Sequence, residues 1–137
     1  MKTLLEISRP ARLESLTPVI ETLAAAAAAH GFSRERVSLL ELVVEEAVVN
    51  ICRHAYPAGE GAFEVRAFDD GDRLIVEIRD AGIPFDPTLL PDPDTHEDLS
   101  RRRPGGLGVY FVKRIGNGVA YRREGTRNIL RFSMARE

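Results

Sequence analysis

The sequence has one cysteine, little net charge and no apolar run long enough to span a bilayer. A single thiol, Cys52, excludes an internal disulfide framework and fits a reducing compartment. A formal net charge of −2 gives no electrostatic attraction to phosphate backbones, so we expect no direct nucleic-acid partner. No signal-peptide core is recognisable, so we expect a cytoplasmic protein with no membrane partner.

The composition predicts one soluble globular domain over residues 1–137. With 44% hydrophobic and 29% charged residues, a chain of 137 residues can bury a core and is unlike a disordered protein. No cluster of His, Cys and acidic residues indicates zinc. No Ser/His/Asp or Cys/His grouping indicates nucleophilic catalysis either.

A strand and a helix are predicted at the start of the chain. Residues 3–8 alternate loosely and fit a strand at a sheet edge. Thr17 is a candidate N-cap, and Pro18 suits the first helical position because its missing N–H costs nothing there. The predicted helix continues through the six alanines at 24–29 and ends at Gly31.

A second, longer helix is predicted from the N-cap candidate Ser33 to about residue 54. Cys52 lies within it and is expected to be a packed thiol rather than a nucleophile. Apolar residues recur along it at three- and four-residue spacing, which indicates a core-facing stripe. The stripe consists of Val37, Leu40, Val44, Ala47 and Ile51.

The remaining chain predicts two hairpins separated by a long segment. Residues 63–68 and 74–78 alternate around the turn at 69–72, which is typical of a hairpin, and a second pair of strands is expected at about 118–122 and 128–134. The order of elements predicts an α+β fold, a two-layer sandwich with a mixed, mostly antiparallel sheet and its helices on one face.

The segment between the hairpins carries five prolines over residues 84–104 and shows no periodicity. A loop of this length in a small domain is usually functional or mobile. A third helix is expected over 107–115, beginning within a glycine-rich segment at 105–108.

Glu46 and Asn50 lie four residues apart, so on a helix their side chains share one face. Arg53 and His54 extend that face, whereas Glu45 points about 100° away. A carboxylate can accept a proton from an attacking hydroxyl, and an amide oxygen suits Mg²⁺. A solvated polar face is the alternative, and the pair taken alone favours that interpretation.

Asp80 and Gly82 follow the first hairpin's second strand. One interpretation is a plain turn, because Asp and Gly are common turn residues. The other is a carboxylate aimed into a pocket, where it accepts a hydrogen bond from an amino group such as the adenine N6, while Gly82 lets the ring approach the backbone.

Residues 105–108, Gly-Gly-Leu-Gly, precede the third predicted helix. Backbone N–H groups and the positive end of a helix dipole favour an anion at such a position. The segment lacks the Walker A and dinucleotide-binding patterns, and a glycine-rich hinge is the alternative interpretation. The neighbouring arginines at 101–103 could close onto a terminal phosphate.

Taken together, these segments resemble the nucleotide-binding boxes of the GHKL (Bergerat-fold) ATPases. Residues 46–56 are similar to the N-box, and most closely to the version found in bacterial anti-sigma factor serine/threonine-protein kinases. Residues 80–86 resemble the first glycine box, and residues 105–112 resemble the second. Gly125 and Thr126 are similar to the pair before the last strand whose threonine helps to hold adenine.

The resemblance implies roles for individual residues. It implies that Glu46 is the general base, Asn50 the Mg²⁺ ligand and Asp80 the adenine-binding residue, with residues 88–104 as a lid over ATP. The other positions that match the family's nucleotide-binding segments are Arg53, His54, Gly82, Pro84, Phe85, Gly105, Gly106, Leu107, Gly108, Val109 and Thr126.

The implied function is that of an ATP- and Mg²⁺-dependent serine/threonine-protein kinase acting as an anti-sigma regulatory factor. Its implied substrate is a STAS-type anti-sigma factor antagonist, with a sigma factor as the competing partner, and a homodimer is left open. The alternative is a nucleotide-responsive module that sequesters a partner and has no kinase activity.

Overall fold

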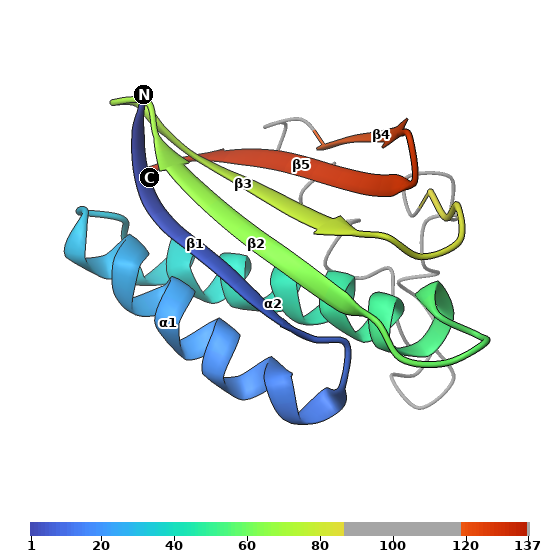
Figure 1. The fold of residues 1–137 in the computed structure, drawn as a ribbon. Coiled ribbons are helices and arrows are strands. Elements are labelled where there is room, and N and C mark those ends of the chain that lie inside the picture. The colour runs from blue at the N-terminus through green and yellow to red at the C-terminus, as the bar shows by residue number, and fades with distance from the viewer. Residues whose placement is uncertain (87–118, 137) are drawn as a thin grey trace, which may run out of the picture.

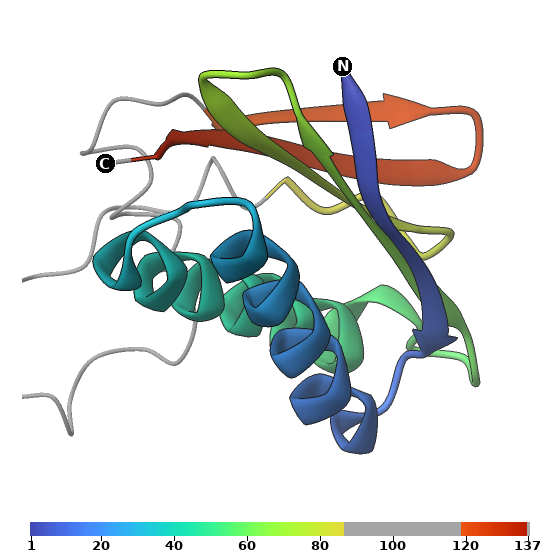
Figure 2. The ribbon, with the colours of Figure 1, turned by 90° about the vertical axis from the view of Figure 1, so that its left-hand side faces the viewer.

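The computed structural model describes residues 1–86 and 119–136, in which a five-stranded sheet lies against two helices (Figure 1). Seen from the side, the sheet and the helices form two separate layers (Figure 2). The strands are β1 (Lys2–Pro10), β2 (Ala62–Asp69), β3 (Arg73–Asp80), β4 (Val119–Glu124) and β5 (Arg127–Ala135).

The strands are ordered β1-β2-β3-β5-β4, so β1 and β4 form the edges and β3 is central. All four neighbouring pairs of described strands are antiparallel. The predicted α+β sandwich with its helices on one face is therefore confirmed, and the first strand lies at a sheet edge as expected. The described part of the sheet contains no parallel pair.

Helix α1 (Leu16–Ala29) begins earlier than the sequence predicted. A 3₁₀ turn at Leu13–Ser15 leads directly into it, so Thr17 already lies inside the helix and the prediction of Thr17 as N-cap was wrong. The preceding hydroxyl, that of Ser15, donates to the carbonyl of Pro10 at 2.8 Å instead of capping the helix. The C-terminal end agrees with the prediction, because Gly31 follows with a φ of 85°.

Helix α2 (Arg34–Asn50) begins as predicted, with the Ser33 hydroxyl accepting a hydrogen bond from the backbone N–H of Arg36 at 3.2 Å. After Asn50 the chain continues as a π-helical turn, Ile51–Ala55, rather than as α-helix. The total length matches the predicted end near residue 54, but the change of helix type was not expected. Such turns often occur near functional sites.

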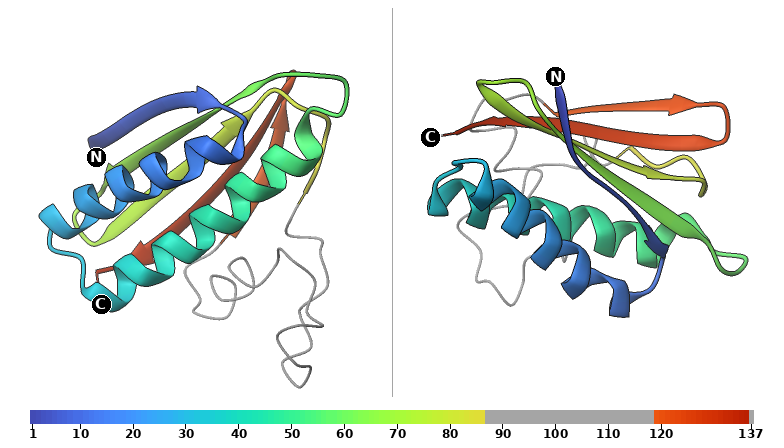
Figure 3. Two further views of the ribbon diagram at one scale, coloured as in Figure 1. Left: turned by 90° about the horizontal axis from the view of Figure 1, so that it is seen from below. Right: turned by 60° about the vertical axis from the view of Figure 1, so that its left-hand side comes forward.

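The hydrophobic core lies between the helices and the inner face of the sheet, where α1 and α2 run side by side (Figure 3). Helix α2 contributes five buried apolar residues and α1 three, and four of the five predicted stripe residues are buried, while Val37 is half-buried against the core. Facing residues of the sheet include Phe63, Val65, Val76, Ile78 and Phe132. None of the helices in the described ranges is long and apolar enough to cross a membrane.

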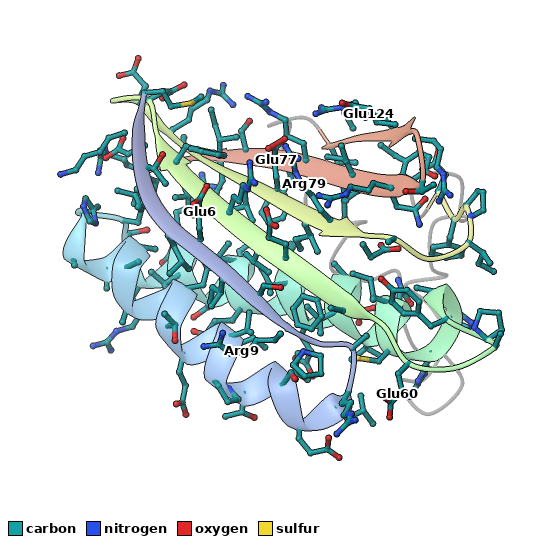
Figure 4. The ribbon with its side chains drawn as sticks, in the orientation of Figure 1. Glu6, Arg9, Glu60, Glu77, Arg79 and Glu124 are labelled. Carbon is teal, nitrogen blue, oxygen red and sulfur yellow. The ribbon has the colours of Figure 1, made fainter. Side chains whose placement is uncertain are left out.

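The opposite face of the sheet carries charged side chains, because alternate residues of a strand point to opposite faces. On β3, Glu77 and Arg79 lie side by side with 3.1 Å between Oε1 and Nη2 (Figure 4). Glu77 is only 4% exposed although no helix covers this face in the described structure. The central position of β3 therefore buries residues on both of its faces.

The two predicted hairpins are confirmed where the structure describes them. The first turn is held by Asp70 Oδ1, which accepts from the backbone N–H groups of Asp72 at 3.1 Å and Arg73 at 2.8 Å. In the second, Gly125 has a φ of 61°, a value that favours glycine. The predicted lid at 88–104 and the predicted helix at 107–115 lie outside the described residues.

Candidate nucleotide-binding site

A cavity that is partly open to solvent lies between the C-terminal part of α2 and the sheet. Three residues that the sequence singled out, Asn50, Asp80 and Phe85, come together at it from separate segments. The lining residues are Ala47, Asn50, Ile51, Ala55, Ile78, Asp80, Phe85, Tyr121, Asn128 and Leu130.

Asn50 lies at the junction of α2 and the π-helical turn and is 8% exposed. Its side-chain nitrogen is buried and has no hydrogen-bond partner in the described structure. An unpaired buried amide costs about 1–3 kcal/mol, so such a group usually meets a ligand or water. The amide nitrogen of Asn50 is thus not committed to the described protein and fits a hydrogen-bond acceptor on a ligand in the cavity.

Glu46 lies one helical turn before Asn50 and is half-buried, whereas its neighbour Glu45 is exposed. The i and i+4 spacing within an α-helix keeps Glu46 on the same side as Asn50. Neither Glu46 nor Glu45 is among the residues that line the cavity in the described structure, so the role of Glu46 stays a prediction.

The predicted face does not continue to Arg53 and His54. Both are exposed, and neither lines the cavity. The prediction assumed α-helical spacing, but the π-helical turn has i→i+5 hydrogen bonds and so changes the direction of the side chains after Asn50. His54 instead stacks on Phe85, with ring centroids 5.8 Å apart and an interplanar angle of 30°.

Asp80 ends β3 inside the cavity and is 8% exposed. Its Oδ1 accepts from the backbone N–H of Gly82 at 2.9 Å and from Asn128 Nδ2 at 2.8 Å. Oδ2 accepts no hydrogen bond from the described residues. One carboxylate oxygen therefore closes a turn, as the first interpretation predicts, whereas the binding of an amino group by Asp80 stays a prediction.

Gly82 is required by the packing of the protein itself. A Cβ at this position would lie 2.3 Å from the carbonyl oxygen of Ala55 and 2.5 Å from its Cβ. Next to it, the backbone N–H of Ile83 donates to the same carbonyl at 2.9 Å. The sequence had suggested glycine here for the approach of a ring, whereas the close approach in this structure is that of the π-helical turn.

Asn128 is a site residue that the sequence analysis missed. It lies on β5 directly opposite Asp80, is 5% exposed and lines the cavity. Its Oδ1 accepts from Tyr121 Oη at 2.5 Å and from Arg123 Nη1 at 3.1 Å. Asparagine is disfavoured in strand interiors, and that was the one signal that could have found it.

Two further predicted residues lie outside the cavity. Pro84 and Thr126 are exposed and line a shallower depression beside Gly82 and Arg123. The predicted glycine-rich segment, comprising Gly105, Gly106, Leu107, Gly108 and Val109, lies outside the described residues. Within residues 1–86 and 119–136 no group of three or more His, Cys, Asp or Glu residues could hold a metal ion.

Comparison with protein families places the chain among nucleotide-binding domains. A family model described as the histidine kinase-like ATPase domain matches residues 9–134. The serine-protein kinase RsbW of Listeria monocytogenes is 30% identical over 115 residues, which cover 80% of this chain and 73% of that protein. The RsbW protein of Bacillus cereus is 25% identical over 119 residues, covering 84% and 74%.

A solved structure shares the fold. The histidine kinase AdeS of Acinetobacter baumannii matches with a TM-score of 0.52 over 96% of this chain and 68% of that one. At 11% sequence identity, this likeness concerns the fold alone.

Proposed function

Since this chain belongs to the histidine kinase-like ATPase family, we propose that it is an ATP-dependent serine/threonine-protein kinase that acts as an anti-sigma regulatory factor. The observation that carries the proposal is one cavity with two polar groups left unpaired by the described protein. These are Oδ2 of Asp80 and the side-chain amide nitrogen of Asn50. A nucleotide has a polar base and a charged phosphate chain, so it needs polar partners at two separate places.

Asp80 is the proposed partner of the base. Its Oδ2 can accept a hydrogen bond from the amino group of adenine. Guanine has an oxygen acceptor at the same position, and opposing two buried acceptors costs about 1–3 kcal/mol. The site therefore favours ATP over GTP.

Asn50 is the proposed Mg²⁺ ligand. An amide oxygen suits Mg²⁺, which commonly keeps several waters and takes further ligands from phosphates rather than from a protein cage. The unpaired atom of Asn50 is its amide nitrogen, so the assignment of its oxygen to Mg²⁺ is supported by the resemblance and by the place of Asn50 in the cavity. When bound, Mg²⁺ neutralises charge on the phosphates. The glycine-rich segment at 105–108 is proposed for the phosphate end as well.

Glu46 is the proposed general base. In the transfer, the substrate hydroxyl oxygen bonds to the γ-phosphorus and the bond from that phosphorus to the ADP oxygen breaks. The hydroxyl proton passes to the carboxylate of Glu46. The half-buried position of Glu46, one turn from Asn50, supports this role over the exposed Glu45.

The proposed substrate is a serine or threonine on a STAS-type anti-sigma factor antagonist, with a sigma factor as the competing partner and the cytoplasm as the location. The test is incubation of the protein with γ-labelled ATP, Mg²⁺ and STAS proteins encoded beside its gene. Transfer of label to a serine or threonine of one of them is the expected result. Binding of ATP and of a STAS protein without transfer would instead identify a nucleotide-responsive sequestering module.

A further inference from the structure

Asn128 donates both of its amide hydrogens to groups of the protein itself. Nδ2 donates to Asp80 Oδ1 at 2.8 Å and to the carbonyl of Ile83 at 2.8 Å. An amide nitrogen carries two hydrogens, so none is left for a ligand. Although Asn128 lines the cavity, its nitrogen can influence a bound base only through the groups to which it donates.

The orientation of the Asn128 amide is fixed from both sides. Its oxygen faces donors, the Tyr121 hydroxyl at 2.5 Å and the Arg123 guanidinium at 3.1 Å. Its nitrogen faces the acceptors on Asp80 and Ile83. A flipped amide would oppose donors to donors and acceptors to acceptors, so only one orientation satisfies the network.

The network also fixes the carboxylate of Asp80. With the backbone N–H of Gly82 and Asn128 Nδ2 both donating to Oδ1, rotation of the carboxylate would break two hydrogen bonds. Oδ2 is thereby left as an acceptor with no partner among the described residues, on a side chain that lines the cavity. A group held in this way distinguishes a hydrogen-bond donor from an acceptor better than one that is free to turn.

We propose that Asn128 is a positioning residue that fixes Asp80 for an amino-bearing purine and so sets the preference of the site for adenine over a 6-oxo purine. The inference rests on the proposed function, because it assigns a role in the binding of ATP. It adds a specificity-determining contact between β3 and β5 to the proposed role of Asp80.

The sharpest variant is Asn128→Asp. It keeps the shape and the oxygen that faces Tyr121 and Arg123, but places an acceptor where Nδ2 donated to Asp80. We expect ATP affinity to fall about 10- to 100-fold, the range for a lost hydrogen bond to a charged group. Binding of ITP, which carries an oxygen in place of the adenine amino group, should fall far less. The ratio of ATP affinity to ITP affinity, measured by titration with Mg²⁺, should therefore be lower in the variant than in the wild type.

A second variant keeps the test decisive if Asn128→Asp does not fold. The double substitution Tyr121→Phe with Asn128→Val replaces both partners by apolar groups and leaves no orphaned hydroxyl at residue 121. It should lower the same ratio. Ser133→Ala is the matched control, because it removes a hydrogen-bonding hydroxyl from β5 outside the cavity. The ratio should stay at the wild-type value in this control.

The outcomes separate the two proposals. A wild-type protein that binds neither ATP nor ITP overturns both the proposed function and this inference. A wild-type protein that prefers ATP, together with folded Asn128 variants that keep the same ratio, overturns only the role of Asn128. Equal losses of ATP and ITP affinity also overturn it, because they indicate a general structural role without an effect on base selection.

Discussion

The carbonyl group of Ala55 lies against Gly82 so closely that the two segments leave no room for a side chain between them. The same carbonyl accepts the backbone N–H of Ile83 at 2.9 Å. The end of the π-helical turn is thereby joined to the segment after Asp80. Because Asn50 precedes that turn and Asp80 precedes that segment, the contact holds the two polar ends of the cavity at a fixed separation.

Gly82→Ala should separate these segments. The added Cβ would lie 2.3 Å from a backbone oxygen, which cannot give way as a flexible side chain can. We expect a loss of about 1–3 kcal/mol in the free energy of unfolding, typical of overpacking, together with weaker ATP binding. Denaturant unfolding measures the first effect and titration the second. Ala81→Ser, at an exposed neighbouring position, is the control, and equal stability of both variants would contradict the packing argument.

Asn50→Ala should weaken binding of ATP in the presence of Mg²⁺ far more than binding in the presence of EDTA. The substitution removes the amide proposed as the metal ligand but leaves the groups around the base intact. Calorimetric titration under both conditions measures the difference. If the substitution lowered ATP affinity by the same factor in Mg²⁺ as in EDTA, Asn50 would have no role in holding the metal.

Glu46→Gln should reduce phosphoryl transfer and leave nucleotide binding nearly unchanged. Glutamine keeps the volume and most of the hydrogen bonding of glutamate but cannot take up a proton at neutral pH. Phosphoryl transfer should fall about 10²- to 10⁴-fold, while nucleotide affinity stays within a few-fold of wild type. A loss near the lower limit is compatible with the loose transition state of this reaction. Glu45→Gln is the matched control on the adjacent exposed residue, and transfer at the wild-type rate by Glu46→Gln would remove Glu46 from the mechanism.

Cys52 should react slowly with alkylating reagents. Burial first, and then the nearby Glu14 carboxylate, raise the pKa of this thiol. A raised pKa lowers the thiolate fraction near neutral pH, and the thiolate is the reactive form. We expect alkylation of the folded protein to be slower than that of the denatured chain, and to accelerate with rising pH. Mass spectrometry after timed labelling with iodoacetamide measures the rate, and equal rates in both states would contradict the burial of the thiol.

Features that depend on nearby residues could be predicted from the sequence. The Ser33 cap, the apolar stripe of α2 and the turn around Asp70 each follow from residues within a few positions of one another. The resemblance of residues 46–56 and 80–86 to known boxes likewise pointed to Asn50 and Asp80, which the fold brings to one cavity.

Features that depend on distant residues could not be predicted in this way. Asn128 lies opposite Asp80 only because β3 and β5 pair in one particular register, which no local pattern reports. Thr17 was mistaken for an N-cap because the 3₁₀ turn before α1 depends on how the chain leaves β1. The role of Gly82 depends on Ala55, a residue of another element.

Because of the π-helical turn, the number of residues between α2 and the following loop is itself constrained. A turn with i→i+5 hydrogen bonds holds about one residue more than a turn of α-helix. Deletion of one of the three residues between Ile51 and Ala55 would allow α2 to continue as a regular helix, and would rotate the following residues by about 100°. The carbonyl of Ala55 would then point away from Ile83 even though every residue that contacts the cavity is still encoded. Insertions and deletions here should therefore be tolerated less well than substitutions at the exposed positions of the same turn.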